Sequence, residues 1–86
     1  MEYSPQYRKG AEKYLDRLPA VVSDRIMSAV DALPEGDIVK LQGRVGYRLV
    51  VGSFRVLFDF TDEITDDGKI VIDVIDVGPR GGIYKK

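Results

Sequence analysis

Tyr47–Phe58 reads YRLVVGSFRVLF, two segments of alternating residues on either side of the pair Gly52-Ser53. Alternation with a period of two is the pattern of a half-buried β-strand. A two-residue connection that begins with glycine favours a tight hairpin turn. The stretch therefore predicts two antiparallel strands whose register is set by the turn.

This register assigns each residue of the hairpin to one of two sheet faces. The turn pairs Val51 with Phe54, and directly opposed residues share a face. The face expected to form the core holds Tyr47, Leu49, Val51, Phe54, Val56, Phe58 and Phe60. The opposite face holds Arg48, Val50, Arg55 and Leu57.

Helical spacing dominates the chain before this hairpin. Ser4-Pro5 resembles a helix start, because a capping hydroxyl precedes a residue that favours the first turn. One apolar stripe then comprises Tyr7, Ala11, Tyr14, Leu15 and Leu18, and a second comprises Val22, Ile26, Val30 and Leu33. Pro19 and Pro34 end these two helices.

After the hairpin, the sequence predicts one more turn and one more long strand. Asp66-Asp67-Gly68 is typical of a turn, and Ile70–Val77 of a strand. Residues 1–3 are expected to add a short edge strand. The sequence thus predicts a single α+β domain over residues 1–86, with an N-terminal helical hairpin packed on a small, mainly antiparallel sheet of three to four strands.

The composition narrows the possible chemistry. The chain has no histidine and no cysteine, which excludes Ser-His-Asp and Cys-His catalysis and thiolate metal sites. It contains no apolar run of about 18 residues and no apolar signal-peptide core, so a membrane partner is not expected. The absence of cysteine fits a cytoplasmic protein, which we expect here.

The charges are unevenly distributed although the net charge is only −1. Acidic residues gather in residues 61–76. Basic residues gather on either side of that segment, at Lys40, Arg44, Arg48, Arg55, Arg80, Lys85 and Lys86. Because arginine binds a phosphate through two parallel hydrogen bonds, and tyrosine can stack on a base, the arginines and Tyr84 suggest a site for a nucleic acid.

The order and spacing of these segments resemble the RelE/ParE superfamily of bacterial and archaeal type II toxins. The resemblance is carried by Lys40-Leu41-x-Gly43, by Tyr47–Phe58 and by Val74–Tyr84. It also includes Tyr3-Ser4 leading into a first helix that ends Leu15-x-x-Leu18-Pro19. It covers essentially the whole chain and implies a RelE-like fold.

RelE-type members are ribosome-dependent endoribonucleases that cleave mRNA. The resemblance implies attack by the nucleotide's own 2′-hydroxyl on the adjacent phosphate, without metal or cofactor. The implied catalytic residues are Arg48, Arg55, Arg80 and Tyr84. The residues expected to contact RNA or the ribosome are Lys40, Arg44, Lys85 and Lys86. The implied partners are a cognate antitoxin, mRNA on the ribosome and, through the antitoxin complex, operator DNA; the free toxin is expected to be monomeric.

Two other functions fit the same sequence. A ParE-type toxin would inhibit DNA gyrase without enzymatic activity. An attenuated member would bind its antitoxin but cleave weakly, because Val50 stands where RelE has a second lysine and the net charge is slightly acidic.

Overall fold

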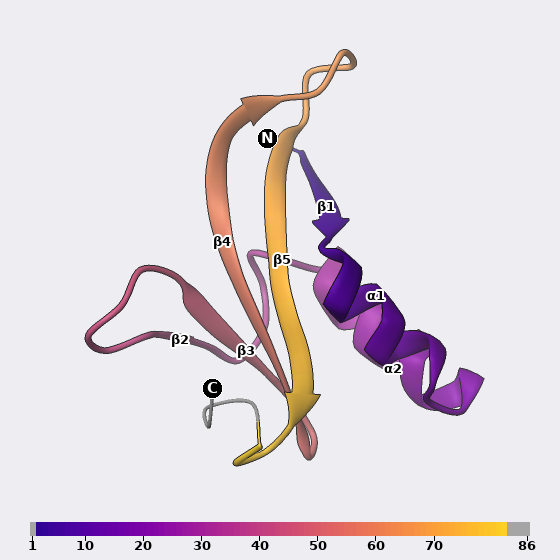
Figure 1. Ribbon diagram of the computed structural model, residues 1–86. Coiled ribbons are helices and arrows are strands. Elements are labelled where there is room, and N and C mark those ends of the chain that lie inside the picture. Colours follow the sequence, from indigo (N-terminus) through magenta and orange to yellow (C-terminus); the bar gives the residue numbers. More distant parts are fainter. Residues whose placement is uncertain (1, 83–86) are drawn as a thin grey trace.

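The computed structural model describes residues 2–82, which form a five-stranded mixed sheet with two helices on one face (Figure 1). The strands lie in the order β1-β5-β4-β3-β2; β1 is parallel to β5, and all other neighbours are antiparallel. The elements are β1 (Tyr3–Tyr7), α1 (Lys9–Asp16), α2 (Ala20–Asp31), β2 (Ile38–Lys40), β3 (Tyr47–Val51), β4 (Phe54–Ile64) and β5 (Ile70–Pro79). The predicted α+β class is confirmed, with five strands instead of three to four.

The N-terminal segment is a strand and not the start of a helix. Ser4 and Pro5 pair in parallel register with β5, and α1 begins only at Lys9. Proline is tolerated because β1 is an edge strand, where a missing N–H need not interrupt the hydrogen-bond ladder. The predicted helix start is therefore wrong, and Tyr7, expected in the first helical stripe, is the last residue of β1. The edge strand is also longer than the stub expected at residues 1–3.

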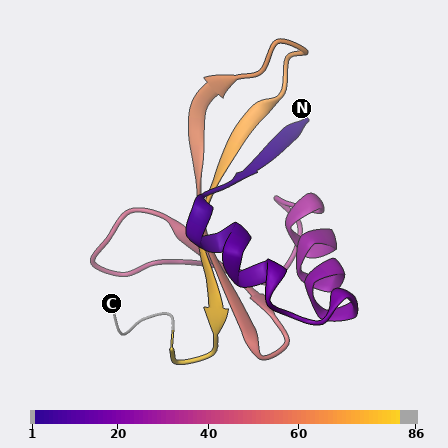
Figure 2. The ribbon, with the colours of Figure 1, turned by 45° about the vertical axis from the view of Figure 1, so that its right-hand side comes forward.

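The two helices cover one face of the sheet (Figure 2). Helix α1 buries Ala11 and Leu15, and α2 buries Ile26 and Val30, all of them members of the predicted stripes. Pro19 separates the helices, as expected, and directly precedes α2. Neither helix in the described part of the chain is long and apolar enough to cross a membrane.

The β3–β4 hairpin has the register that its sequence predicts. Val51 pairs with Phe54 across the turn, and Arg48 pairs with Leu57 further along the strands. Glycine suits the first turn position because Gly52 has a φ of 58°, in the left-handed region. The turn chemistry therefore fixes which side chains of this hairpin face the helices.

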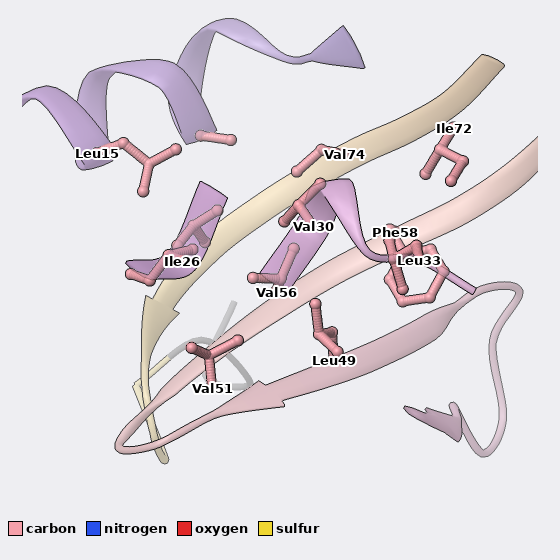
Figure 3. Packing of buried hydrophobic residues seen from close by; sticks show 12 residues of the cluster. Leu15, Ile26, Val30, Leu33, Leu49, Val51, Val56, Phe58, Ile72 and Val74 are labelled. Carbon is pink, nitrogen blue, oxygen red and sulfur yellow. The ribbon is translucent and has the colours of Figure 1, made fainter. Parts of the chain in front are cut away.

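The core fills the space between the helices and this sheet face (Figure 3). Phe58 is fully buried at its centre, with ring centroids 5.7 Å from Tyr47 and 5.6 Å from Phe60. Aliphatic side chains from both helices and from β3, β4 and β5 complete the cluster. Burial of this apolar surface is the main driving force of folding.

A bulge between β4 and β5 changes which β5 side chains reach the core. Asp76 lies opposite Leu57, but Val74 lies opposite the next β4 residue, Phe58, so β5 contains one extra residue. Val74 and Val77 are consequently both buried in the core although they are three residues apart. The same shift places Asp76 in register with Leu57, on the face away from the helices.

Candidate anion-binding face

The sheet face opposite the helices, which we call the open face, carries Arg48, Val50, Arg55, Leu57 and Asp76. Arg48 pairs with Leu57, and Arg55 pairs with Val50. The two arginines are thus diagonal neighbours on adjacent strands, a relationship that separates residues by about 7–8 Å. Both are half-buried. At this separation, two long guanidinium side chains can reach a common ligand.

Arg55 is held against the β3–β4 turn by its own side chain. Its Nη1 donates hydrogen bonds to the carbonyl oxygens of Gly52 at 3.0 Å and of Phe54 at 2.8 Å. These two bonds engage the Nη1 end of the guanidinium. The Nε–Nη2 edge has the fork geometry that binds a phosphate through two bonds. Arg55 is therefore oriented by the backbone and can still bind an anion.

Arg80 occupies the corner of a tight turn directly after β5. The N–H of Gly82 donates to the carbonyl oxygen of Pro79 at 3.1 Å, and Gly81 has a φ of 85°, which identifies a type II turn with Arg80 in its second position. The backbone N–H of Arg80 donates to the carbonyl oxygen of Ser53 at 2.8 Å. The turn places Arg80 beside the β3–β4 turn, while its side chain is exposed.

Two further side chains near these arginines were not identified as site residues from the sequence. Asp76 is half-buried on the open face, and its Oδ1 accepts a hydrogen bond from the N–H of Val77 at 2.9 Å. Its position depends on the β5 bulge, which simple alternation does not reveal. Arg25 approaches from α2: its Nη2 lies 3.6 Å from the point that a Cβ on Gly52 would occupy. The sequence signal for Arg25 is that it is the sole basic residue of α2.

A pocket of about 320 Å³ lies at the β2 edge of the sheet. It is lined by Val39, Lys40, Leu41, Gln42, Arg44 and Arg48. Three of these residues are cations that the sequence predicts as RNA-binding or catalytic residues, and they come from β2, the following loop and β3. The structure therefore brings Lys40 and Arg44 together with Arg48 around one cavity.

The remaining predicted site residues lie outside the described residues. These are Tyr84, Lys85 and Lys86, and their roles stay predictions. Of the catalytic set, the structure places Arg48 and Arg55 on the open face and Arg80 at the adjoining turn. A surface of this kind can bind phosphate groups of a single-stranded nucleic acid.

Comparison with known proteins shows which fold this chain resembles. No protein-family model and no curated protein sequence matches the chain. Among solved structures, the archaeal RelE–RelB complex from Pyrococcus horikoshii contains a chain with 27% sequence identity and a TM-score of 0.66, and the match covers 95% of this chain and 99% of that one. This chain is RelE-like. The recognition made from the sequence is thereby confirmed.

A second solved structure supports the fold of the RelE-like chain. The RelBE2 toxin–antitoxin complex from Mycobacterium tuberculosis matches 93% of this chain and 100% of its own, with a TM-score of 0.62. At 16% identity, this likeness concerns the fold alone. Two helices on one face of a five-stranded mixed sheet therefore match the RelE fold.

Proposed function

We propose that the RelE-like chain is the toxin of a type II toxin–antitoxin system and cleaves mRNA on the ribosome without a metal ion. The observation that carries the proposal is the placement of Arg48, Arg55 and Arg80 around one end of the open face. Each comes from a different strand or turn, and Arg55 and Arg80 are both anchored to the same β3–β4 turn. The proposed site of action is the cytoplasm, where mRNA is translated.

The proposed reaction is an intramolecular transesterification. The 2′-oxygen of one nucleotide forms a bond to the adjacent phosphorus, and the bond from phosphorus to the 5′-oxygen breaks. The products are a 2′,3′-cyclic phosphate and a 5′-hydroxyl; the 2′-hydroxyl loses a proton and the leaving oxygen gains one. Arg55 and Arg80 would stabilise the negative charge that develops on the phosphate, and Arg48 would assist either of them.

Proton transfer is assigned separately from charge stabilisation. Arginine cannot serve as the base, because it is not deprotonated in proteins. The proposed residue for stacking on the base or assisting proton transfer is Tyr84. A tyrosine near its ordinary pKa of about 10 is mostly neutral at pH 7. We therefore expect slow cleavage of free RNA and faster cleavage when the ribosome orients the substrate.

Expression in a bacterial host, with growth and mRNA 5′ ends followed together, tests this function. We expect growth arrest and new, translation-dependent cuts that disappear in Arg55→Ala and in Arg80→Ala. Lys13→Ala, which removes an exposed cation from α1, is the matched control and should cut like the wild type. Cuts that persist in both arginine variants would refute the site.

Two other outcomes would point to the alternative functions. Growth arrest and DNA breaks with intact mRNA would indicate a ParE-type gyrase inhibitor. Normal growth with abundant folded protein would indicate an attenuated member, and Val50, which pairs with Arg55 on the open face, would be the first residue to replace by lysine.

We also propose that the RelE-like chain binds a cognate antitoxin. The support is that the two similar solved structures named above are toxin–antitoxin complexes. Co-expression with the product of a small neighbouring reading frame should restore growth and yield a stable complex, which could in turn bind operator DNA. A neighbouring product that neither restores growth nor co-purifies would contradict this pairing.

A further inference from the structure

Asp76 places a carboxylate among the arginines of the open face. It lies opposite Leu57 on β4, and Leu57 lies opposite Arg48 on β3, so the three residues form one row across the sheet. Two strand spacings separate Arg48 from Asp76, which amounts to about 10 Å. Arg55 is the diagonal neighbour of Asp76, at a typical distance of about 7–8 Å that long side chains can span. A ligand bound at Arg55 therefore lies within reach of Asp76.

The centre of this row is shielded from water. Leu57 faces away from the helices, yet it is only 2% exposed, and Arg48 and Asp76 on either side of it are half-buried. Charges interact more strongly in such a place than in bulk water, because the effective dielectric constant is lower. The arginines can thereby offset the repulsion between the carboxylate of Asp76 and a phosphate.

The backbone orients the carboxylate of Asp76. Its Oδ1 accepts a hydrogen bond of 2.9 Å from the N–H of Val77. The two oxygens of a carboxylate have about four lone-pair sites, so this bond orients the group and leaves it able to accept a proton. The β5 bulge directs Asp76 to the open face while Val74 and Val77 lie in the core. Asp76 is thus a fixed acceptor on the face that carries Arg55.

The proposed cleavage needs a group that removes the proton of the attacking 2′-hydroxyl. The arginines cannot do so, because a guanidinium is not deprotonated in proteins. Val50, which lies opposite Arg55, is aliphatic and accepts no proton either. In a reactive geometry, the 2′-oxygen lies about 3–3.5 Å from the phosphorus. With the phosphate on Arg55 and Arg80, the 2′-hydroxyl is therefore near Asp76.

We propose that Asp76 is the general base of the cleavage reaction. Its carboxylate takes the proton of the 2′-hydroxyl while the 2′-oxygen forms its bond to phosphorus and the bond from phosphorus to the 5′-oxygen breaks. Water supplies the proton that the leaving 5′-oxygen gains, and the carboxylic acid of Asp76 afterwards returns its proton to water. This inference rests on the proposed function for the reaction, and it assigns the proton acceptor that the arginines cannot provide.

Single-turnover cleavage of mRNA on purified bacterial ribosomes tests Asp76 directly. We expect Asp76→Asn, which keeps the size of the side chain and a hydrogen-bond acceptor, to cleave about 10²- to 10⁴-fold more slowly, the usual contribution of general acid–base catalysis. Asp76→Glu, which restores a carboxylate, should recover part of this loss. Cleavage by Asp76→Asn at the wild-type rate would overturn the inference.

Asp59 provides a matched control on the same sheet face. It is also half-buried, and its Oδ1 accepts a hydrogen bond of 2.9 Å from the N–H of the next residue, Phe60, as Asp76 does from Val77. It lies four residues beyond Arg55 along β4, about 13 Å away. Asp59→Asn should therefore cleave like the wild type. An equal loss of rate in the two variants would contradict a specific role for Asp76.

Binding of a message that cannot be cleaved separates proton transfer from folding and substrate binding. The probe is mRNA with a 2′-O-methyl group at the cut, held on the ribosome. We expect Asp76→Asn to bind this complex at least as tightly as the wild type, since it removes a negative charge from an anion site. A loss of binding as large as the loss of rate would refute the assignment.

The pH dependence of the rate separates a base from a residue that only shapes the site. Among the described residues, the charged groups around Asp76 on the open face are Arg48, Arg55, Asp59, Asp73 with its partner Arg8, and Arg80. We expect the wild-type rate to fall at low pH as the base is protonated. The rate of Asp76→Asn should lack this fall, whereas that of Asp59→Asn should keep it. The same fall in Asp76→Asn and wild type would show that another group is the base.

A substrate with sulfur in place of the 5′-oxygen at the cut distinguishes a base from an acid. A thiolate leaves without a proton, so this substrate restores the rate of an enzyme that lacks its acid but not of one that lacks its base. We expect Asp76→Asn to stay slow on it relative to the wild type. Recovery of the wild-type rate would make Asp76 the acid and overturn its assignment as the base.

The two proposals fail in different ways. Wild-type protein that leaves mRNA intact on the ribosome would reject the nuclease and, with it, the base. Cuts that need Arg55 and Arg80 but not Asp76 would keep the nuclease and reject the base alone.

Discussion

The backbone N–H of Arg80 donates a 2.8 Å hydrogen bond to the carbonyl oxygen of Ser53. This bond joins the turn that follows β5 to the turn between β3 and β4. Because the side chain of Arg55 is bonded to the same β3–β4 turn, the two arginines share one backbone support. Their relative position should therefore depend on turn geometry as much as on their own side chains.

The turn around Arg80 can be tested through Gly81. Its φ of 85° is costly for a residue with a Cβ, by about 1–2 kcal/mol, although no atom of the described residues lies within 4 Å of the point that a Cβ on Gly81 would occupy. We expect Gly81→Ala to reduce mRNA cleavage with little change in melting temperature, because the turn lies beyond the last strand. Gly81→Asn, which tolerates this conformation better, should retain more cleavage. Equal cleavage by Gly81→Ala and wild type would show that this turn does not position Arg80.

The aromatic centre of the core should dominate stability. Phe58→Ala removes a fully buried ring that contacts Tyr47 and Phe60, and we expect it to lower the free energy of unfolding by about 3–5 kcal/mol. This is a large part of the roughly 5–15 kcal/mol that is typical of a domain. Urea denaturation measures the change. Val21→Ala, at a side chain that is 80% exposed, is the control and should change the free energy of unfolding by less than about 0.5 kcal/mol. Equal effects of the two substitutions would contradict the packing described for Phe58.

The ion pair between Arg8 and Asp73 should make stability depend on salt. Arg8 donates from Nε to Oδ1 at 3.0 Å and from Nη2 to Oδ2 at 2.7 Å, and this hydrogen-bonded carboxylate raises the pKa of Arg8. The pair joins the start of α1 to β5. We expect Arg8→Ala to lower the melting temperature modestly at low ionic strength. The difference should shrink in roughly 1 M salt, where the Debye length is only about 3 Å. A decrease in melting temperature that does not change with salt would mean that Arg8→Ala removes packing contacts and not a charge interaction.

The hydroxyl of Tyr7 should produce a pH dependence at high pH. Burial, with a smaller contribution from Asp31, raises the pKa of Tyr7 to about 12. The unfolded chain ionises Tyr7 near its ordinary value of about 10, whereas the folded chain keeps it neutral. The contribution of this group to stability is therefore present below about pH 10 and is lost as the pH rises towards about 12.

Comparison of wild type with Tyr7→Phe isolates this effect from the titration of other groups. The hydroxyl oxygen of Tyr7 is buried without a hydrogen-bond partner among the described residues, so the variant should be at least as stable as wild type below about pH 10. Above that pH, the free energy of unfolding of Tyr7→Phe should increasingly exceed that of the wild type. Free energies of unfolding that stay parallel from about pH 8 to 12 would contradict the raised pKa.

Local sequence was sufficient to predict the elements whose geometry is set by neighbouring residues. The two-residue turn at Gly52-Ser53 fixed the register of β3 and β4, and with it the faces of Arg48 and Arg55. The same approach predicted the wrong structure for the N-terminal segment. Ser4-Pro5 has the local signature of a helix start, but pairing with a strand more than sixty residues later determines its conformation. The superfamily resemblance depended on motif order and was unaffected by this error.

The site was only partly predictable, for the same physical reason. Lys40 and Arg44 were recognised as cations, but their convergence with Arg48 on one pocket depends on how the loop after β2 returns to β3. Asp76 reaches the open face because of a bulge that shifts the alternation of β5. Arg25 meets the β3–β4 turn through helix packing. None of these relationships is encoded in the spacing of a single segment.

The position of β5 has a consequence for the synthesis of the protein. Among the described strands, β5 is the last to be synthesised, yet it lies between β4 and β1 and supplies Ile72, Val74 and Val77 to the core. A nascent chain that ends before Ile70 has neither the strand partner of β1 nor these side chains beneath α1. Since emergence proceeds from the N-terminus, the helices lack their final packing partner until β5 has left the ribosome. The native sheet can be completed only after β5 (Ile70–Pro79) has emerged from the exit tunnel.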